Sequence, residues 1–317
     1  MSALKKGENV KILTGGQATI LDEKPLGFGG QGEVFRVSYN NNTYALKWYT
    51  DPDIIKNEAF YNNIAQNILD GEPDSNFVWP LHLTEKRRDA YGRVSYGYLM
   101  ELFPKGYFEL GDILNTYAYK LDTRTNKKVK VDVVVKNIEV SMRAAIKIVR
   151  AFMELHRAGK SYQDINHGGV SINVGTGDVL ICDCDNVSST NLGIKGFPGY
   201  MAPEVLLGTS RPDMITDRFS LAVLLFKMLI RADPFWGKIQ ENYKSKPGED
   251  TDLLFYGKDP VFIFHPTDRR NRPSDSNANK LWPLFRYNLS GRLCTANDKG
   301  VQIIVYSDFS TKTVIVE

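Results

Sequence analysis

Hydrophobic and polar residues alternate in short runs over the first hundred residues, a pattern typical of β-strands. The polar segment 39–42 separates two of these runs and predicts a hairpin. Apolar residues at helical spacing predict one helix over 53–69, with Asp51 or Asp53 as its cap and Gly71 after its end. We therefore expect an antiparallel sheet with one helix in this part of the chain. The runs that predict its strands are 33–38, 43–49, 76–84 and 94–102.

Helical spacing dominates after Pro104. It predicts helices over 109–119, 138–157 and 217–230. The basic segment 123–131 is interpreted as a solvated loop in preference to a binding patch. The apolar face predicted for the helix 138–157 consists of Met142, Ala145, Ile146, Val149, Phe152 and Met153. Two hairpins are predicted, at 170–182 and at 301–317.

The composition is that of a globular protein, with 42% hydrophobic and 24% charged residues among 317. These values exclude a disordered or collagen-like chain. A net charge of +3 gives no reason to expect a nucleic-acid partner. Three cysteines argue against a disulfide framework and for a reducing compartment. Because no apolar run approaches the roughly 20 residues of a membrane span, and the N-terminus lacks a signal-peptide pattern, we expect a cytoplasmic protein without a membrane partner.

A glycine-rich segment, Gly27-Phe28-Gly29-Gly30-Gln31-Gly32, is the first candidate for chemistry. Such a pattern also occurs in dinucleotide-binding folds, but there it opens a helix, whereas here a strand-like run follows. A glycine loop between two strands is typical of the flap that covers ATP phosphates in protein kinases. A plain hairpin turn is the alternative.

The segment Tyr44-Ala45-Leu46-Lys47 follows the glycine loop on the next predicted strand. It is similar to the kinase strand whose lysine binds the α- and β-phosphates of ATP. The lysine of that strand pairs with a glutamate of the next helix. Glu58 is the acid in the interior of the predicted helix 53–69, so we expect it to pair with Lys47.

Two aspartates, Asp164 and Asp183, each lie next to strand-like residues. In the order of kinase motifs, Asp164 would orient the acceptor hydroxyl and Asp183 would hold Mg²⁺. Further along, Ala202-Pro203-Glu204 and Asp217 match structural motifs of the same series. We expect Glu204 to pair with an arginine, for which Arg272 is a candidate, and Asp217 to accept hydrogen bonds from the backbone of the catalytic loop.

Over roughly residues 20–235 the sequence resembles the eukaryotic-like protein kinases. The phrases ALKWY, FVWPL, SYQDIN and YMAPEVLLG resemble a bacterial branch of Ser/Thr kinases. Members of that branch are often encoded beside a von Willebrand-type protein and a metal-dependent phosphatase in tellurite-resistance-like clusters. The resemblance implies an α+β, two-lobed fold, with a small antiparallel β lobe with one helix (1–102), a larger mainly helical lobe (103–285) and a divergent β-like tail (286–317).

The resemblance also implies ATP and Mg²⁺ as cofactors, transfer of the γ-phosphate to Ser/Thr of a protein substrate, and those two cluster neighbours as candidate partners. Asp164 and Lys47 would be catalytic, and Asp183 would bind the metal. Met100 would be the gatekeeper, with Glu101 and Leu102 as the hinge beside adenine. The implied nucleotide-binding residues are Gly27, Phe28, Gly29, Gly30, Gln31, Gly32, Val34, Ala45, Lys47, Glu58, Met100, Glu101, Leu102 and Asp183.

The sequence departs from the kinase pattern at several positions. Gln163 stands where an arginine would bind a phosphorylated activation loop, so switching by phosphorylation is not expected. Gly169 stands where an asparagine would bind a second Mg²⁺, and Asn173 is expected to point elsewhere. Asp185 is interpreted either as an extra metal ligand or as a structural residue.

Three functions stay open from the sequence. An active Ser/Thr kinase is favoured, because the phosphate-binding lysine and both aspartates are present. A pseudokinase that acts as a nucleotide-binding regulatory or scaffold module is the alternative, because of Gly169. A small-molecule phosphotransferase is disfavoured by the Ala-Pro-Glu segment. A zinc site at Cys182 and Cys184 is disfavoured too, since no second pair of ligands accompanies them.

Overall fold

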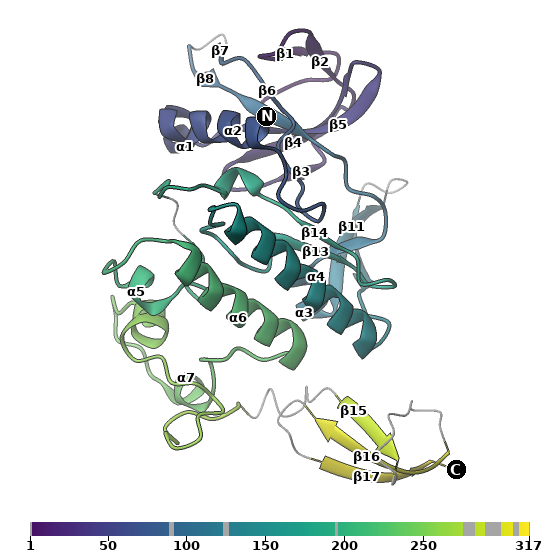
Figure 1. Cartoon of the computed structure of the whole chain (residues 1–317), viewed down its shortest axis with the longest axis vertical. Helices are drawn as coiled ribbons and strands as arrows, with labels where there is room; N and C mark the ends of the chain where they lie inside the picture. The colour runs from purple at the N-terminus through teal and green to yellow at the C-terminus, as the bar shows by residue number, and fades with distance from the viewer. Residues whose placement is uncertain are drawn as a thin grey trace. The chain divides into compact units, whose positions relative to one another are not determined.

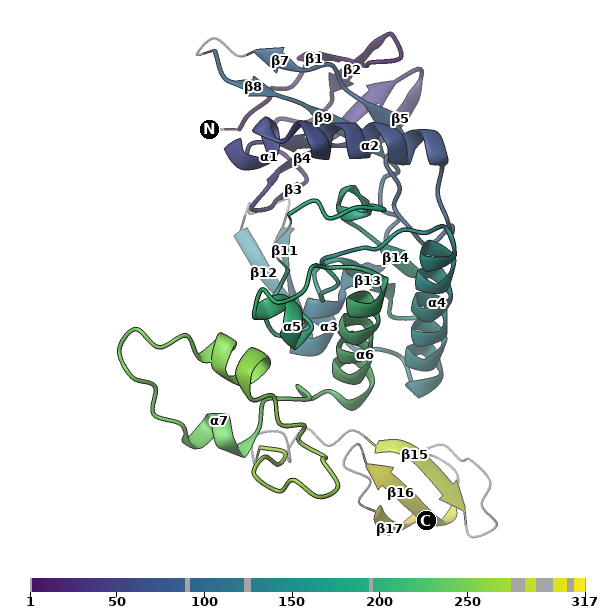
Figure 2. The same ribbon diagram turned by 60° about the vertical axis from the view of Figure 1, so that its left-hand side comes forward.

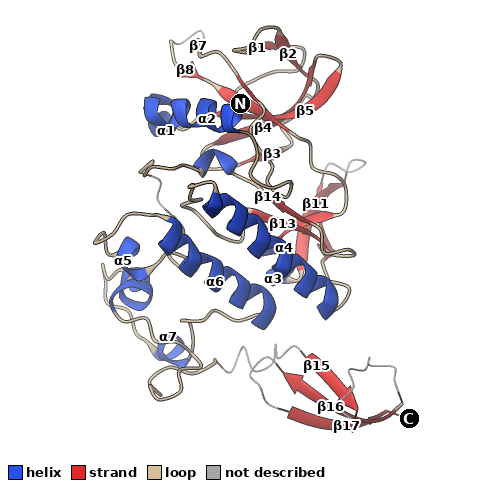
Figure 3. Ribbon diagram, in the orientation of Figure 1, coloured by secondary structure: helices blue, strands red, loops and turns tan. Residues whose placement is uncertain are grey.

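The computed structural model describes residues 2–88, 92–122, 127–193, 196–274, 283–288, 299–306 and 311–316. It contains both helices and strands, shown in blue and red in Figure 3, and so has the α+β composition expected. The chain forms two compact units. The first comprises Met1–Tyr107, Arg150–Tyr162 and Leu180–Ile194, and the second comprises Phe108–Val149, Gln163–Val179 and Lys195–Glu317.

The first unit is built on an antiparallel sheet with strand order β1-β2-β4-β5-β9-β6, and β3 pairs with β4 (Figure 1). The predicted hairpin is confirmed, and its two-residue loop places Asn40 and Asn41 at φ 48° and 61°. Both residues thus meet the positive-φ requirement of a type I′ turn. The strands are β1 (Asn9–Lys11), β2 (Gln17–Ile20), β3 (Gly27–Phe28), β4 (Gly32–Tyr39), β5 (Asn42–Tyr49), β6 (His82–Leu83) and β9 (Gly97–Met100).

Two of the predicted strands are shorter than expected. The run 76–84 contains only β6, and the run 94–102 is divided into β8 (Val94–Ser95) and β9. β8 pairs with β7 (Arg87–Arg88) outside the main sheet.

Side chains alternate between the two faces of the strands in the first unit, and they pack into two apolar clusters. One cluster includes Val37 and Leu46, and the other includes Tyr49 and Tyr98. Phe60 and Ile64 of α2 (Glu58–Asp70) belong to the second cluster, so α2 packs on that face of the sheet, as Figure 2 shows.

The prediction of one helix over 53–69 is wrong, because the chain breaks at Asn57. α1 (Pro52–Lys56) begins after the cap Asp51, and α2 begins after Asn57. The Asn57 side chain accepts a hydrogen bond from Phe60 N and so starts a new helix. Gly71 ends α2 with φ 78°, as expected.

The second unit begins with a helix that is shorter than predicted. α3 (Leu110–Asn115) ends at Thr116, whose φ is 67°. The chain then forms an antiparallel hairpin of β11 (Tyr117–Asp122) and β12 (Lys127–Asp132). The basic segment interpreted as a loop therefore includes a strand, although residues 127–130 are solvent-exposed as expected.

The two longest helices agree with the prediction in position. α4 (Ile138–Arg157) matches the predicted span, but its apolar face is turned from the one expected, since Met142, Ile146 and Met153 are exposed. α6 (Met214–Ile230) begins with a capping box between Asp213 and Thr216. The buried residues of α4 are Val140, Ala144, Ala145, Ile148, Ala151, Phe152 and Leu155.

The remaining elements are short. The predicted hairpin at 170–182 is confirmed as β13 (Val170–Asn173) and β14 (Val179–Ile181), and β13 also pairs with β10 (Tyr107–Glu109). The short helical segments are η1 (Cys184–Asn186), α5 (Pro203–Leu206), α7 (Lys238–Asn242) and the π-helix η2 (Leu253–Lys258). No helix in the described part of the chain is long and apolar enough to cross a membrane.

The tail contains three antiparallel strands, β15 (Pro283–Asn288), β16 (Gly300–Tyr306) and β17 (Thr311–Val316). The pairing of β16 with β17 confirms the predicted hairpin at the end of the chain. Residues 289–298, 307–310 and 317 of the predicted tail lie outside the described residues.

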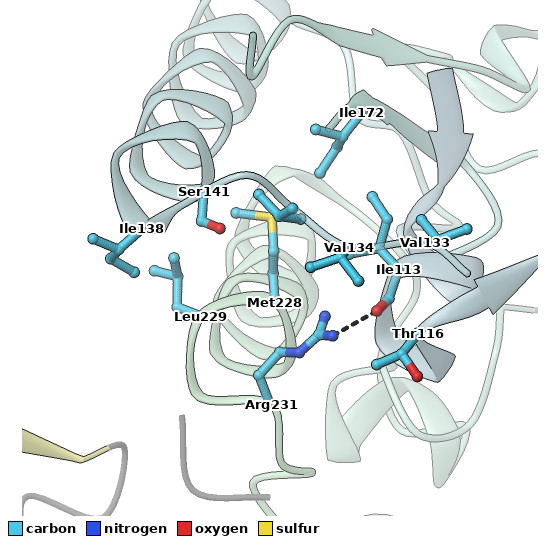
Figure 4. Close-up of a pocket in the computed structure, with 11 residues that line it drawn as sticks. Ile113, Thr116, Val133, Val134, Ile138, Ser141, Ile172, Met228, Leu229 and Arg231 are labelled. Carbon is cyan, nitrogen blue, oxygen red and sulfur yellow. Dashed lines mark hydrogen bonds between the residues drawn. The ribbon is translucent and has the colours of Figure 1, made fainter. Parts of the chain in front are cut away.

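An apolar cavity lies within the second unit, between α3, α4 and the end of α6 (Figure 4). Its lining includes Ile113, Val134, Ile172 and Met228, and Arg231 donates a hydrogen bond to Ile113 O at 2.5 Å. The cavity holds about 60 Å³. That is room for a few water molecules.

Candidate nucleotide and catalytic sites

Lys47 lies on β5 of the first unit and is almost completely buried, with 7% of its surface exposed. Its ammonium donates to Gln31 Oε1 at 3.0 Å, to Asp183 Oδ1 at 2.9 Å and to Asp185 Oδ2 at 2.8 Å. Burial lowers the pKa of Lys47, but the two carboxylates outweigh burial and raise the pKa above its usual value. The lysine is therefore a fixed positive charge.

The glycine-rich segment forms the hairpin of β3 and β4, as a kinase-type flap requires. Gly27 pairs with Val34, and Gly29 N donates to Gly32 O at 2.8 Å. The flap reaches Lys47 through Gln31. The glycines serve different purposes: a Cβ at Gly32 would lie 2.1 Å from Trp48 O, whereas a Cβ at Gly30 would meet nothing within 4 Å.

Several of the residues expected to contact adenine belong to one apolar cluster of the first unit. Ala45 is opposite Met100 in the register of β5 and β9, and Val34 and Leu102 pack against the same cluster. The side chains of Phe28 and Glu101 are exposed. Sequence reasoning missed two further members, Leu180 and Cys182, although their place just before Asp183 was a usable signal.

Asp183 combines a left-handed backbone with an accessible carboxylate. Its φ and ψ are 49° and 39°, and its side chain is 47% exposed. Asp183 Oδ1 binds Lys47, and within the described ranges Oδ2 accepts no hydrogen bond. Mg²⁺ in nucleotide sites is commonly held by one or two carboxylates together with phosphate oxygens. The donor set therefore fits Mg²⁺ that arrives with ATP, and no cluster of three or more His, Cys, Asp or Glu among the described residues offers a separate metal site.

The expected ion pair between Lys47 and Glu58 is wrong. Glu58 is the first residue of α2, its side chain is 70% exposed, and Glu58 Oε1 lies 2.5 Å from Lys86 Nζ. Because the break at Asn57 moves Glu58 to the helix start, the carboxylate faces the surface lysine instead. Asp185, which is fully buried, occupies the position next to Lys47.

The loop that carries Asp164 lies in the second unit, and two of its interactions bear on the predicted roles. Gln163 N donates to Asp217 Oδ1 at 3.0 Å, which confirms the role expected of Asp217. Asn166 Nδ2 donates to Asp164 Oδ1 at 3.0 Å and thereby orients the carboxylate of Asp164. This contribution of Asn166 was not predicted from the sequence.

Gly169 is buried, and its backbone does not lie in the positive-φ region. The glycine is therefore not required by backbone conformation. Asn173 cannot replace the missing metal ligand, because its side chain accepts hydrogen bonds from Gly175 N and Thr176 N in the turn of the β13–β14 hairpin. This confirms the expectation that Asn173 points elsewhere.

The segment after Asp183 is attached to the first unit. Ser188 is 2% exposed and exchanges backbone hydrogen bonds with Ser161 at 2.8 and 2.9 Å. Leu192 is buried in the same apolar cluster as Met100. Ser189 and Thr190 are exposed, whereas residues 194–195 lie outside the described ranges.

The expected pairing of Glu204 with Arg272 is also wrong. Glu204 and Arg272 are both exposed, and the described part of the chain contains no ion pair between them. Cys184 is fully buried, and burial raises the pKa of its thiol, so Cys184 is not a ready thiolate ligand for zinc.

The backbone conformation distinguishes the loop that carries Asp164 from most of the chain, and it does the same for the loop that carries Asp183. Among the described residues, six that are not glycine have positive φ. Asn40 and Asn41 form the hairpin turn, and Thr116 and Arg231 cap helices. The other two are Gln163, next to Asp164, and Asp183. Sparsely populated backbone conformations cluster at functional sites, so this distribution supports a functional reading of these two loops.

The comparisons with known proteins agree with this geometry. The family model of the protein kinase domain matches residues 99–280, more than half of the chain. The chain therefore belongs to the protein kinase domain family. Its fold is that of a protein kinase domain, composed of both helices and strands.

Three kinases illustrate the similarity. The chain is 32% identical over 106 residues to Serine/threonine-protein kinase sck2 of Schizosaccharomyces pombe, covering 31% of this chain and 16% of that protein. It is 28% identical over 245 residues to cGMP-dependent protein kinase, isozyme 2 forms cD5/T2, of Drosophila melanogaster, covering 74% and 23%. It is 28% identical over 243 residues to Serine/threonine-protein kinase Warts of the same organism, covering 67% and 22%. The chain thus spans less than a quarter of the length of these relatives.

Proposed function

We propose that the chain is an active protein kinase that transfers the γ-phosphate of Mg-ATP to Ser or Thr of a protein. The observation that carries this proposal is the group in the first unit: a buried, charged Lys47 that binds the half-exposed carboxylate of Asp183 beside a glycine hairpin. Lys47 would bind phosphate oxygens, and Asp183 would hold Mg²⁺. When bound, Mg²⁺ neutralises charge on the phosphates.

The remaining roles follow from the motifs. Asp164, oriented by Asn166, would accept the proton of the acceptor hydroxyl. The apolar cluster of Val34, Ala45 and Met100 offers apolar contact for adenine, and the hinge at Glu101 and Leu102 follows directly along the chain. We propose that the bacterial branch is a functional parallel, and that a von Willebrand-type protein and a metal-dependent phosphatase are the first partners to test.

A pseudokinase is the second candidate, because Gly169 provides no side-chain ligand for a second Mg²⁺. The two functions share nucleotide binding and differ in transfer. Binding is tested by thermal unfolding with and without Mg-ATP. A ligand at a hundredfold excess over its Kd stabilises the native state by about 2.7 kcal/mol.

We expect Mg-ATP to raise the melting temperature of the natural chain and to raise that of Asp183→Asn much less. Lys47→Met should abolish both the shift and any phosphate transfer. An unchanged melting curve at millimolar Mg-ATP would contradict both candidate functions. A clear rise in melting temperature without any phosphate transfer would favour the pseudokinase over the active kinase.

A further inference from the structure

We propose that Asp185, and not a glutamate of the helix, is the carboxylate that positions Lys47 for nucleotide binding. This inference rests on the proposed function and assigns a positioning residue to it. Asp185 lies on η1, in the same unit as Lys47. Lys47 Nζ donates to both of its oxygens, at 3.1 Å to Oδ1 and at 2.8 Å to Oδ2.

The surroundings of Asp185 exclude it as a metal ligand. Tyr49 OH donates to Asp185 Oδ2, and Tyr98 OH donates to Oδ1 at 3.3 Å. A carboxylate offers about four lone-pair positions. The four hydrogen bonds from Lys47 and the two tyrosines fill them, and the side chain has no exposed surface. The carboxylate is therefore committed to the lysine and its neighbours.

The two aspartates beside Lys47 thus have different tasks. The side chain of Asp183 is half-exposed, and one of its carboxylate oxygens accepts a hydrogen bond from Lys47. The side chain of Asp185 is fully buried, and both of its carboxylate oxygens accept hydrogen bonds from Lys47. An enclosed carboxylate with four hydrogen bonds is held rigidly. It can fix the position of the Lys47 ammonium while Asp183 remains accessible to a metal ion.

The helix supports this arrangement with amides in place of a carboxylate. Asn63 Nδ2 donates to Asp185 O at 3.4 Å and to Val187 O at 2.7 Å, and Asn67 Nδ2 donates to Val187 O at 2.8 Å. These bonds attach η1 and the residue after it to α2. Asn63 is thus the α2 residue whose side chain bonds to the backbone of Asp185 itself, whereas Asn67 bonds only to that of Val187. The helix positions the lysine indirectly, through the backbone that carries Asp185.

The test compares Asp185→Asn with Glu58→Gln, which changes the carboxylate originally expected to pair with Lys47. Asp185→Asn keeps the shape of the side chain but removes its charge. We expect it to weaken Mg-ATP binding at least tenfold and to lower kcat/KM for ATP by the same factor or more, with KM for the protein acceptor unchanged. Glu58→Gln should change both quantities by less than twofold.

A relocation variant separates positioning from a merely structural role. In Asn63→Glu/Asp185→Asn, the helix supplies the carboxylate that residue 185 has lost. We expect at least threefold recovery of Mg-ATP affinity relative to Asp185→Asn. If Asp185→Asn does not fold, the double variant is itself the test and should fold and bind Mg-ATP.

The outcomes distinguish this inference from the function on which it rests. If the natural chain binds Mg-ATP, but Glu58→Gln loses affinity while Asp185→Asn keeps it, the assignment of Asp185 is wrong and the kinase proposal stands. A double variant that binds no better than Asp185→Asn also overturns the assignment. If the natural chain does not bind Mg-ATP at all, both proposals fall.

Discussion

Asp183 and Gln163 adopt left-handed backbone although neither is glycine. Such conformations cost about 1–3 kcal/mol each and persist where the surroundings impose them. Here the Asp183 carboxylate binds Lys47, and the backbone N–H of Gln163 binds Asp217. The motifs predicted that these loops matter. They did not predict the backbone conformation, because that depends on partners far away in the sequence.

The carboxylate that binds Lys47 is a second feature that the sequence did not predict. The sequence indicated Glu58, since spacing along the chain was the sole guide. The structure brings Asp185 to Lys47 across 138 positions of sequence. The ligand set of a buried charge is decided by tertiary packing, which here places the carboxylate that binds Lys47 on η1 and not on α2.

The first prediction concerns Gly169, which lacks the oxygen ligand expected for a second Mg²⁺. Its backbone does not lie in the positive-φ region, so asparagine is compatible with the backbone conformation. Loss of one electrostatic contact to a transition state typically costs on the order of a hundredfold in rate. We expect Gly169→Asn to raise kcat at least tenfold, measured by steady-state transfer over a series of Mg²⁺ concentrations.

Asn173→Ala is the control for this experiment. The Asn173 side chain is bound within its own hairpin turn, so its loss should leave the dependence of transfer on Mg²⁺ unchanged. The explanation of Gly169 fails if Gly169→Asn folds normally and gives no gain at any Mg²⁺ concentration.

At the scale of elements, long periodic patterns were read correctly and short polar ones were not. α4, α6 and the β4–β5 hairpin lie where the hydrophobic pattern predicts them. The β11–β12 hairpin was missed, because β12 carries mainly polar residues and the two strands pair with each other outside the larger sheets. The break at Asn57 was missed because local capping competes with an uninterrupted helical pattern.

The flap gives a second prediction, with two glycines as a matched pair. A Cβ at Gly32 would overlap Trp48 O, so Gly32→Ala should force β4 and β5 apart. Overpacking of this kind costs about 1–3 kcal/mol. Gly30→Ala meets no atom and should leave the free energy of unfolding unchanged. It should still raise KM for ATP several-fold, because a methyl group would hold the backbone amides away from the phosphates.

Thermal unfolding without ligand and steady-state kinetics with varied ATP together check this pair. The roles assigned to the two glycines would be wrong if both variants lowered the free energy of unfolding equally. They would also be wrong if Gly30→Ala bound Mg-ATP as tightly as the natural chain.

At the scale of the whole molecule, the match to the kinase family begins at residue 99. The glycine hairpin and Lys47 lie before that point. The assignment of the nucleotide site therefore depends on the motifs and on the contacts of Lys47, whereas the assignment of the family depends on the later part of the chain. The two lines of reasoning are independent, and they point to the same chemistry.

A third prediction concerns control by phosphorylation. A phosphate orders a loop by pairing with arginine, and Gln163 stands where that arginine is expected. Three hydroxyl residues, Ser188, Ser189 and Thr190, follow one another in the loop. Ser188 is buried and exchanges backbone hydrogen bonds with Ser161, whereas Ser189 and Thr190 are exposed. Replacing Ser189 and Thr190 by alanine should leave turnover within a few-fold of the natural chain. A large loss of turnover in this variant, together with higher turnover of the natural chain once Ser189 or Thr190 is phosphorylated, would show that the loop is a switch after all.

The central claim is that this chain carries out phosphate transfer with Lys47 and Asp183. The most direct measurement incubates the natural chain and Asp183→Asn in parallel with Mg-ATP labelled in the γ-phosphate and a generic protein acceptor, followed by phosphoamino-acid analysis. We predict label on Ser or Thr with the natural chain and background label with Asp183→Asn. A natural chain that binds Mg-ATP but transfers no label at any Mg²⁺ concentration would contradict the claim.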